Sequence, residues 1–191
     1  MKLIFATQNL HKLKEARQIL TGMVELISLR ELDYDDELPE TGTTFESNAM
    51  QKAMHVYRKF GIDCFADDSG LSVNALNGAP GVYSARYAGV NARNEDNIAK
   101  LLLELRNESR REARFITCIA LVLGGKEYYF EGEVKGTIAE EISGVAGFGY
   151  DPVFIPDGST RSFAEMKPEE KNSISHRAQA MHKMAAFLVE Q

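Results

Sequence analysis

Two adjacent carboxylates stand at the end of a short apolar run. Asp67 and Asp68 follow the apolar residues of FADDSGL (65–71), and a Ser-Gly pair comes after them. Neighbouring side chains of an extended segment point to opposite sides, so the two aspartates should have different tasks. A turn at the Ser-Gly pair, or an ion pair with a nearby lysine or arginine, would account for them. The chemical alternative is that one aspartate, together with Glu40 of LPETGTTF, holds Mg²⁺, which prefers carboxylates plus substrate phosphates.

A second group of polar residues precedes the first expected helix. The stretch TQNLHK (7–12) lies between an expected strand and that helix. Ligands collect at the carboxyl ends of strands in open α/β sheets, and a helix N-terminus attracts anions. Thr7 and Asn9 offer short hydrogen-bonding side chains and Lys12 adds a positive charge, so the stretch could bind a phosphate. The alternative is that Thr7 or Asn9 only caps the helix.

A third group combines aromatic and charged residues in GFGYDP (147–152) and EEKNSISHR (169–177). An aromatic ring between glycines can lie against a flat ligand ring, whose edges a nearby Asp, His or Arg can hydrogen-bond. The alternative is that the aromatic residues belong to the core and that the His-Arg pair is a solvated first helical turn.

Composition limits the class of protein. The chain has 191 residues, 44% of them hydrophobic, which is ordinary for one globular domain spanning 1–191. Its net charge of −6 gives no broad basic surface, so nucleic acid is not an expected partner. The longest apolar run, Phe115–Leu123, is too short for a membrane span. Cys64 and Cys118 lie in apolar stretches without a CxxC pair, which is typical of buried free thiols in a reducing cytoplasm.

Apolar periodicity alternates between strand and helix along the chain. Strand, helix and strand at the start predict a parallel βαβ unit. Thr43 and Glu46 form the expected capping box of the second helix, which Gly61 can end. The pair Gly124–Gly125 favours a β-hairpin, which makes the sheet mixed. We expect these elements: strand 2–6, helix 13–20, strand 24–28, helix 45–60, strand 62–66, a structured loop 77–89, helix 98–105, strands 115–123 and 128–134, and a last helix from Ser173 or Ser175.

Five segments, in order and spread over nearly the whole chain, carry a resemblance to a known family: FATQNLHKLKE, ETGTTFESNAMQKA, FADDSGLSVNALNGAPGVYSARYAG, GFGYDPVFIP and EEKNSISHRAQA. With them the chain resembles the inosine/xanthosine triphosphate pyrophosphatases. The resemblance implies an α/β fold with an elongated mixed sheet, flanking helices and two lobes around a cleft, assembled as a homodimer. It also implies Mg²⁺-dependent hydrolysis of ITP, dITP or XTP to the monophosphate and pyrophosphate, which removes deaminated purines from the nucleotide pool.

The resemblance implies roles for particular residues. Glu40 and Asp68 match the metal carboxylates, and Asp68 also matches the proton acceptor. Arg177 and His176 could donate to the 6-oxo group of the purine, a group that adenine lacks. Ser47 departs from the pattern, because many relatives have Glu there. The positions that match substrate-binding residues are Thr7, Gln8, Asn9, Leu10, His11, Lys12, Lys52, Ser69, Phe148, Gly149, Tyr150, Asp151, Lys171, His176 and Arg177.

Two other functions remain open at this point. One is a pyrophosphatase of the same fold that prefers another base, such as a modified pyrimidine. The other is a catalytically silent nucleotide-binding module, although such a module has little need of metal carboxylates.

Overall fold

The computed structural model describes residues 1–191, which divide into two compact units. The first unit consists of Met1–Asp68, Thr117–Gly132 and Arg177–Gln191, and the second of Ser69–Ile116 and Glu133–His176. No helix combines the length and the apolar character that a bilayer crossing requires.

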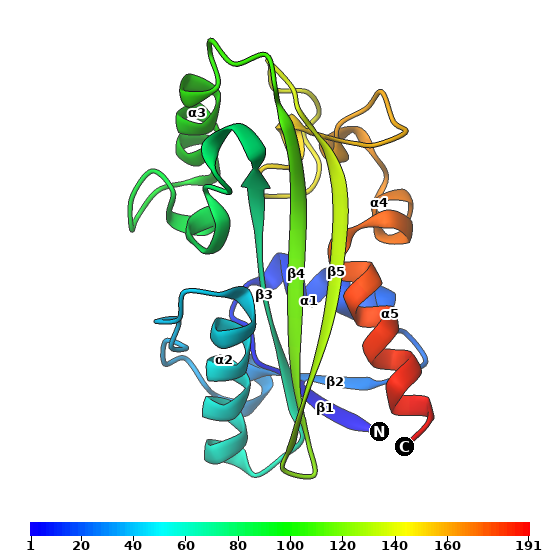
Figure 1. Cartoon of the computed structure of the whole chain (residues 1–191). Coiled ribbons are helices and arrows are strands. Elements are labelled where there is room, and N and C mark those ends of the chain that lie inside the picture. Colours follow the sequence, from blue (N-terminus) through cyan, green and yellow to red (C-terminus); the bar gives the residue numbers. More distant parts are fainter. The chain divides into compact units, whose positions relative to one another are not determined.

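Six strands form the sheet, hydrogen-bonded in the order β2-β1-β3-β4-β5-β6. Strand β1 pairs in parallel with β2 and β3, whereas β5 and β6 are antiparallel, so the predicted mixed sheet is confirmed. The three long strands β3, β4 and β5 each contribute residues to both units (Figure 1). Gly124 and Gly125, both with positive φ, make the predicted hairpin turn between β4 and β5. The strands are β1 Lys2–Phe5, β2 Glu25–Ser28, β3 Cys64–Val73, β4 Glu112–Leu123, β5 Lys126–Ile138 and β6 Phe154–Pro156.

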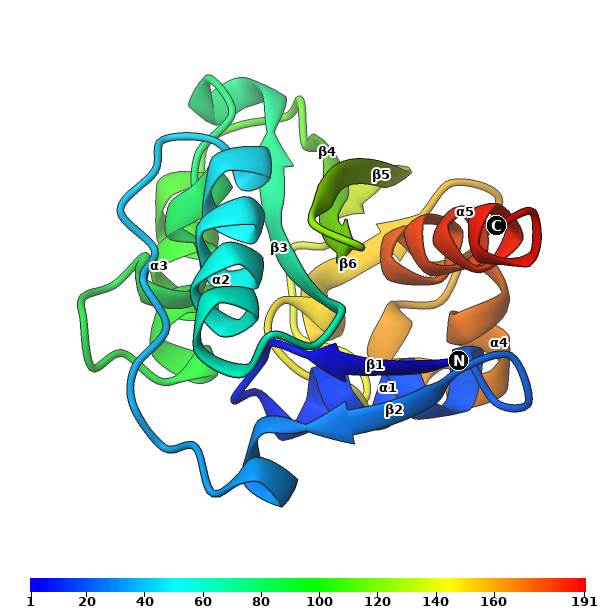
Figure 2. The ribbon, with the colours of Figure 1, turned by 90° about the horizontal axis from the view of Figure 1, so that it is seen from below.

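In the first unit, helices cover both faces of its part of the sheet (Figure 2). These helices are α1 Leu10–Ile19, α2 Phe45–Phe60 and α5 His176–Val189. Side chains alternate between the faces of β3, so Phe65 packs with α1 and α5 while Cys64 and Ala66 pack with α2. The rings of Phe5 and Phe65 stack 4.5 Å apart on the face that α1 and α5 cover. This alternation fixes which helix each residue of β3 faces.

The N-cap of helix α2 lies one residue later than the predicted capping box places it. Its N-cap is Thr44, whose hydroxyl accepts from the Ser47 N–H at 3.1 Å while the Ser47 hydroxyl accepts from the Thr44 N–H. The predicted capping box of Thr43 and Glu46 is therefore wrong. Asn48 accepts from the N–H of Gly42 at 2.8 Å, which keeps the residues just before Thr44 in the loop.

The C-terminal end of α2 follows the prediction. Gly61 has φ +64°, a left-handed conformation that favours glycine, and its N–H donates to the carbonyl of Tyr57.

The second unit packs around a single apolar cluster that includes Leu71, Leu101, Phe115 and Phe154. Its helices are α3 Asn94–Glu104 and α4 Pro168–Ile174. The structured loop expected at 77–89 contains a 3₁₀ turn, Gly81–Arg86. Short 3₁₀ turns also occupy Leu29–Leu32, Asn74–Leu76, Asp151–Val153 and Phe163–Glu165.

Several boundaries differ from the predicted ones: α1 begins at Leu10 and α3 at Asn94, both earlier than expected, and β5 extends beyond both predicted ends. Strand β3 does not stop at the Ser-Gly pair after Asp68 but continues to Val73, because β4 lies beside it in the sheet and outweighs the local turn preference. The last helix follows Ser175, as predicted, whereas the other candidate start, Ser173, lies inside α4. Helix α4 and strand β6 were not predicted, because both are short.

Candidate active site

Strand β3 presents its two aspartates to different helices, as the alternation along a strand predicts. Asp67 accepts from Lys12 of α1 and from Arg177 of α5. Asp68 accepts from Asn48 of α2. Two consecutive positions within β3 therefore carry two polar clusters in the first unit, one on each face of the sheet.

Asp67 is the centre of a buried ion-pair network. Its side chain is fully buried, 3.1 Å from the Lys12 ammonium and 3.0 Å from Nε of Arg177. Nη1 of Arg177 donates to Glu15 at 2.5 Å, which ties α5 to α1. Burial by itself raises the pKa of Asp67, but Lys12, Arg177 and Lys52 outweigh burial and hold that pKa below its ordinary value. Asp67 is therefore a permanent anion that positions two cations.

The cluster around Asp68 has a different electrostatic balance. Lys52 lies 3.9 Å from Asp68 Oδ1, hydrogen-bonds to Glu40, and donates to the main-chain oxygen of Asp67 at 2.8 Å. Burial, helped by the charge of Glu40, raises the pKa of Asp68 despite the opposing effects of Lys52 and Lys12. Of the two aspartates, Asp68 is the one whose environment suits a proton acceptor.

The loop before α1 shows capping rather than open phosphate donors. Asn9 is the N-cap, and its side chain accepts from the N–H groups of His11 and Lys12. Thr7 accepts from the N–H of Asn9 at 3.2 Å. Gln8 donates to two main-chain oxygens of a neighbouring loop. A phosphate at this helix end would have to compete with these contacts.

Leu10 and Lys12 lie in the first turn of α1, directly after this loop. Leu10 is exposed, while the Lys12 side chain is mostly buried. Burial lowers the pKa of Lys12, helped by Lys52 and Arg177, although Asp67 opposes the shift. Lys12 is thus held by its ion pair, with its amine beside the acidic strand end.

The carboxylates of Glu40 and Asp68 fit a magnesium ion chemically. Both offer oxygen atoms, which Mg²⁺ prefers, and Mg²⁺ commonly takes only one or two protein carboxylates with phosphates as the rest. Lys52 already contacts Glu40 and lies near Asp68, so the two carboxylates can share one cation. No group of three or more His, Cys, Asp or Glu side chains is arranged for a metal.

In the second unit, Asp151 organises the predicted base-binding segment. Its Oδ2 accepts from the N–H of Phe148 at 2.9 Å and from Lys171 at 2.7 Å. A side chain at position 147 would come within 2.0 Å of the same oxygen, so Gly147 is required there. The Lys171 ammonium lies 5.1 Å from the centre of the Phe148 ring, a cation–π distance. The segment is a fixed turn that includes Gly149, also with positive φ.

Other predicted residues of the second unit lie in its interior. Tyr150 is buried in the apolar cluster, and its hydroxyl donates to the carbonyl of Ser84 at 2.9 Å. His176 stacks on Phe115, with ring centres 4.7 Å apart and planes 8° apart. Ser69 is half-buried on β3. Tyr150 and His176 are thus packed residues, and the roles predicted for them in base recognition stay predictions.

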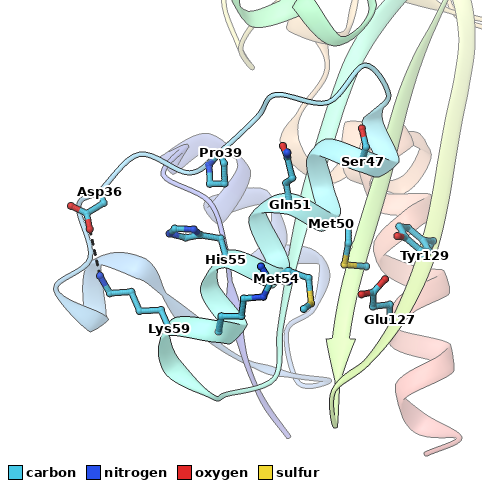
Figure 3. Close-up of a pocket in the computed structure, with 11 residues that line it drawn as sticks. Asp36, Pro39, Ser47, Met50, Gln51, Met54, His55, Lys59, Glu127 and Tyr129 are labelled. Carbon is cyan, nitrogen blue, oxygen red and sulfur yellow. Dashed lines mark hydrogen bonds and ion pairs between the residues drawn. The ribbon is translucent and has the colours of Figure 1, made fainter.

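A hollow beside α2 is separate from all these residues. It has a volume of about 810 Å³, and no predicted substrate or metal residue lines it (Figure 3). Its lining residues are Asp36, Pro39, Ser47, Met50, Gln51, Met54, His55, Arg58, Lys59, Glu127 and Tyr129.

Two residues in the polar clusters were missed by sequence reasoning. Asn48 contacts Asp68, and Glu15 contacts Arg177. Helical spacing could have indicated both, because Asn48 precedes Lys52 by one turn and Glu15 follows Lys12 by three residues.

The fold and this site define an α/β protein with a mixed sheet and a lysine–carboxylate cluster around one central strand. Residues 3–187 match the model of the Ham1 family, and the chain belongs to this family.

Named relatives are similar over nearly the whole chain. A dITP/XTP pyrophosphatase of Porphyromonas gingivalis is 52% identical, over 98% of this chain and 97% of its own length. The dITP/XTP pyrophosphatase of Christiangramia forsetii is 49% identical, over 98% of this chain and 99% of its own length.

Solved structures share the fold. The Ham1 protein of Staphylococcus aureus superposes with a TM-score of 0.90 at 39% identity, over 100% of this chain and 99% of that one. A HAM1 protein from Coxiella burnetii gives a TM-score of 0.91 at 41% identity, covering both chains fully.

Proposed function

We propose that this protein hydrolyses non-standard purine nucleoside triphosphates, ITP, dITP, XTP or dXTP, to the monophosphate and pyrophosphate. Full-length relatives at 49% and 52% identity bear the name dITP/XTP pyrophosphatase. The observation that carries the proposal is the convergence of Glu40, Lys52 and Asp68 in the first unit. Carboxylates and a lysine around one point are what a polyphosphate with a divalent cation requires.

In the proposed reaction, water attacks the α-phosphorus. The new bond joins the water oxygen to that phosphorus, and the bond from the α-phosphorus to the bridging oxygen breaks, so pyrophosphate leaves with the electron pair. Asp68 accepts the proton of the water, a task that its raised pKa favours. Lys12 and Lys52 stabilise the negative charge of the phosphates.

Glu40 and Asp68 would hold Mg²⁺ in this proposal. When bound, the ion supplies charge neutralisation at the phosphates and lowers the pKa of a coordinated water.

We expect the base to be recognised by the residues that the resemblance indicates. The face of Phe148, fixed beside Lys171, suits a flat purine ring. A 6-oxo group accepts hydrogen bonds, and the resemblance indicates Arg177 and His176 as its donors; adenine presents an amino group there, which cannot accept from them. We also expect a homodimer in the cytoplasm, which light scattering of the purified protein and fractionation of the source cells can test.

A substrate panel tests the proposed function. Pyrophosphate release is measured for ITP, dITP, XTP, GTP, ATP and a modified pyrimidine triphosphate, each with and without Mg²⁺. We expect release from ITP, dITP and XTP but not from ATP, and only with Mg²⁺; GTP also has a 6-oxo group, so its rate measures whether the 2-amino group is rejected. Equal hydrolysis of ATP and ITP would contradict the 6-oxo argument, and preference for the pyrimidine would establish the other base specificity. Binding of ITP without any product would instead indicate a silent binding module.

Asp68→Asn is the matched variant for this panel. It keeps the shape of the side chain but cannot accept the proton, so turnover of ITP should fall at least a hundredfold in a folded protein. Activity near that of the wild type would remove Asp68 from its proposed role.

A further inference from the structure

A buried amide connects the carboxylate of Asp68 to the loop that carries Glu40. Asn48 is 1% exposed, and its Nδ2 donates to Asp68 Oδ2 at 3.0 Å. Its Oδ1 accepts from the N–H of Gly42 at 2.8 Å, two residues after Glu40. One side chain thus holds the carboxylate on β3 and the loop that carries the second carboxylate.

Only a side chain with both a donor and an acceptor can make these two contacts. A carboxylate at position 48 could accept from Gly42 but could not donate to Asp68, and an apolar residue could do neither. The loop also depends on close packing, because a side chain at position 42 would come within 2.0 Å of Ser47 Oγ and 2.9 Å of Asn48 Oδ1. Gly42 therefore allows the loop to lie against the first turn of α2.

Asn48 acts on the opposite oxygen of Asp68 from Lys52. Lys52 approaches Oδ1, whereas Asn48 donates to Oδ2. Asn48 and Lys52 are four residues apart on α2 and so share one face of the helix. Asn48 therefore holds one carboxylate oxygen by a hydrogen bond, while the Lys52 ammonium lies 3.9 Å from the other, so the orientation of the carboxylate depends on Asn48.

We propose that Asn48 is a positioning residue that orients Asp68 for proton transfer and holds the Glu40 loop at a set distance from it. This inference rests on the proposed function. Asn48 itself touches neither substrate nor reacting atoms; it acts through the carboxylate. Loss of a group that orients an active-site carboxylate typically lowers activity or metal affinity ten- to a hundredfold.

Three variants separate orientation of Asp68 from simple support of the loop. Asn48→Ala removes both contacts. Asn48→Asp keeps the acceptor for Gly42 and removes the donor to Asp68. Gln51→Ala is the matched control, because Gln51 is another amide of α2 that contacts the same loop, donating to the Thr41 hydroxyl at 2.7 Å and accepting from its N–H, without touching Asp68.

Steady-state hydrolysis of ITP with saturating Mg²⁺ gives the first readout. We expect Asn48→Ala and Asn48→Asp to lower kcat at least tenfold with KM for ITP within about twofold of the wild type, and Gln51→Ala to keep kcat within about twofold. Wild-type kcat in Asn48→Asp, or an equal loss of kcat in Gln51→Ala, would show that Asn48 only supports the loop and would overturn the inference. If the wild type itself releases no pyrophosphate from ITP, the proposed function fails instead.

A second readout needs neither metal nor activity. In the ¹⁵N–¹H spectrum of the metal-free protein, the side-chain amide signals of Asn48 are assigned by their loss in Asn48→Ala or, if that variant does not fold, by through-bond assignment of the wild type. We expect these signals to move in Asp68→Asn, because their acceptor changes from a carboxylate to an amide. Unchanged signals would mean that Asn48 does not hold Asp68, which would also overturn the inference.

Discussion

Replacing each of the two adjacent aspartates by asparagine should change stability in different directions. Asp67 and Asp68 are consecutive on β3 and both buried, yet the pKa of Asp67 is lowered and that of Asp68 is raised. A lowered pKa means that the folded protein stabilises the carboxylate, and a raised pKa means that it disfavours the carboxylate. At pH 7, Asp67→Asn should therefore destabilise the protein, whereas Asp68→Asn should leave it as stable or make it more stable.

The size of the first effect follows from the contacts of Asp67. Removing one partner of a buried ion pair typically costs about 3–5 kcal/mol. Arg177 keeps its bond to Glu15, and the asparagine oxygen can still accept one hydrogen bond, so the lower end applies, about 3 kcal/mol. For a chain of this size each kcal/mol shifts the thermal midpoint by about 2–4 °C, which gives a decrease of roughly 6–12 °C.

The pH dependence of the difference tests its electrostatic origin. A carboxyl whose pKa is lower in the folded state stabilises the protein above its unfolded pKa, and this contribution is lost as pH falls through the folded value. The unfolded reference for Asp67 is 3.8. The difference in the free energy of unfolding between the wild type and Asp67→Asn should have its full size at pH 7 and should shrink below about pH 4.

Thermal and urea denaturation at pH 7 and pH 3, followed by circular dichroism, measure both variants against the wild type. Equal midpoints for Asp67→Asn and the wild type at pH 7 would refute the network around Asp67. If Asp68→Asn lowered the thermal midpoint at pH 7 as much as Asp67→Asn does, the assignment of different environments to the two residues would be refuted.

Other expected outcomes concern the metal, the second unit and the packing. Chelation of Mg²⁺ with EDTA should abolish ITP hydrolysis and leave the circular dichroism spectrum and the thermal midpoint unchanged; unfolding on chelation would indicate a structural metal. Lys171→Met leaves the buried Asp151 without its cation and should cost about 3–5 kcal/mol in urea denaturation, and adding Asp151→Asn should recover part of that loss. Burial raises the pKa of the thiols of Cys64 and Cys118 to about 12, so the native protein should not react with a disulfide reagent at pH 8. The free energy of unfolding should fall as pH rises above about 9, because the thiols then ionise only in the unfolded chain. Gly61→Ala should destabilise by about 1 kcal/mol in the same denaturation assay, because φ is +64° and no atom lies near the added methyl group; an unchanged midpoint would contradict this.

Local rules in the sequence predicted most of the elements. The parallel start, helix α2 with Gly61 at its end, and the hairpin at Gly124–Gly125 were predicted from periodicity and turn residues, and the structure confirms them. These features depend on residues a few positions apart. The elements that were missed, α4 and β6, are too short for a period to be recognised.

The length of β3 depended on a distant strand, whereas the start of α2 depended on a choice between two neighbouring caps. The Ser-Gly pair after Asp68 favours a turn, but β4 lies beside this part of β3 and keeps the strand extended. The start of α2 was missed for a local reason: Thr44 and Ser47 form the capping box in place of Thr43 and Glu46.

For the candidate site, the sequence alone determined that Asp67 and Asp68 face opposite sides, because this follows from the geometry of an extended strand. It could not determine which cations each would meet. Lys12 and Arg177 come from α1 and α5, which are far apart in the chain, and meet at Asp67 only in the folded protein, where Glu15 of α1 also pairs with Arg177. The different pKa shifts of two identical neighbouring side chains, and the position of Asn48 between Asp68 and the loop that carries Glu40, were therefore decided by the tertiary structure, because burial and charge act through space and not along the chain.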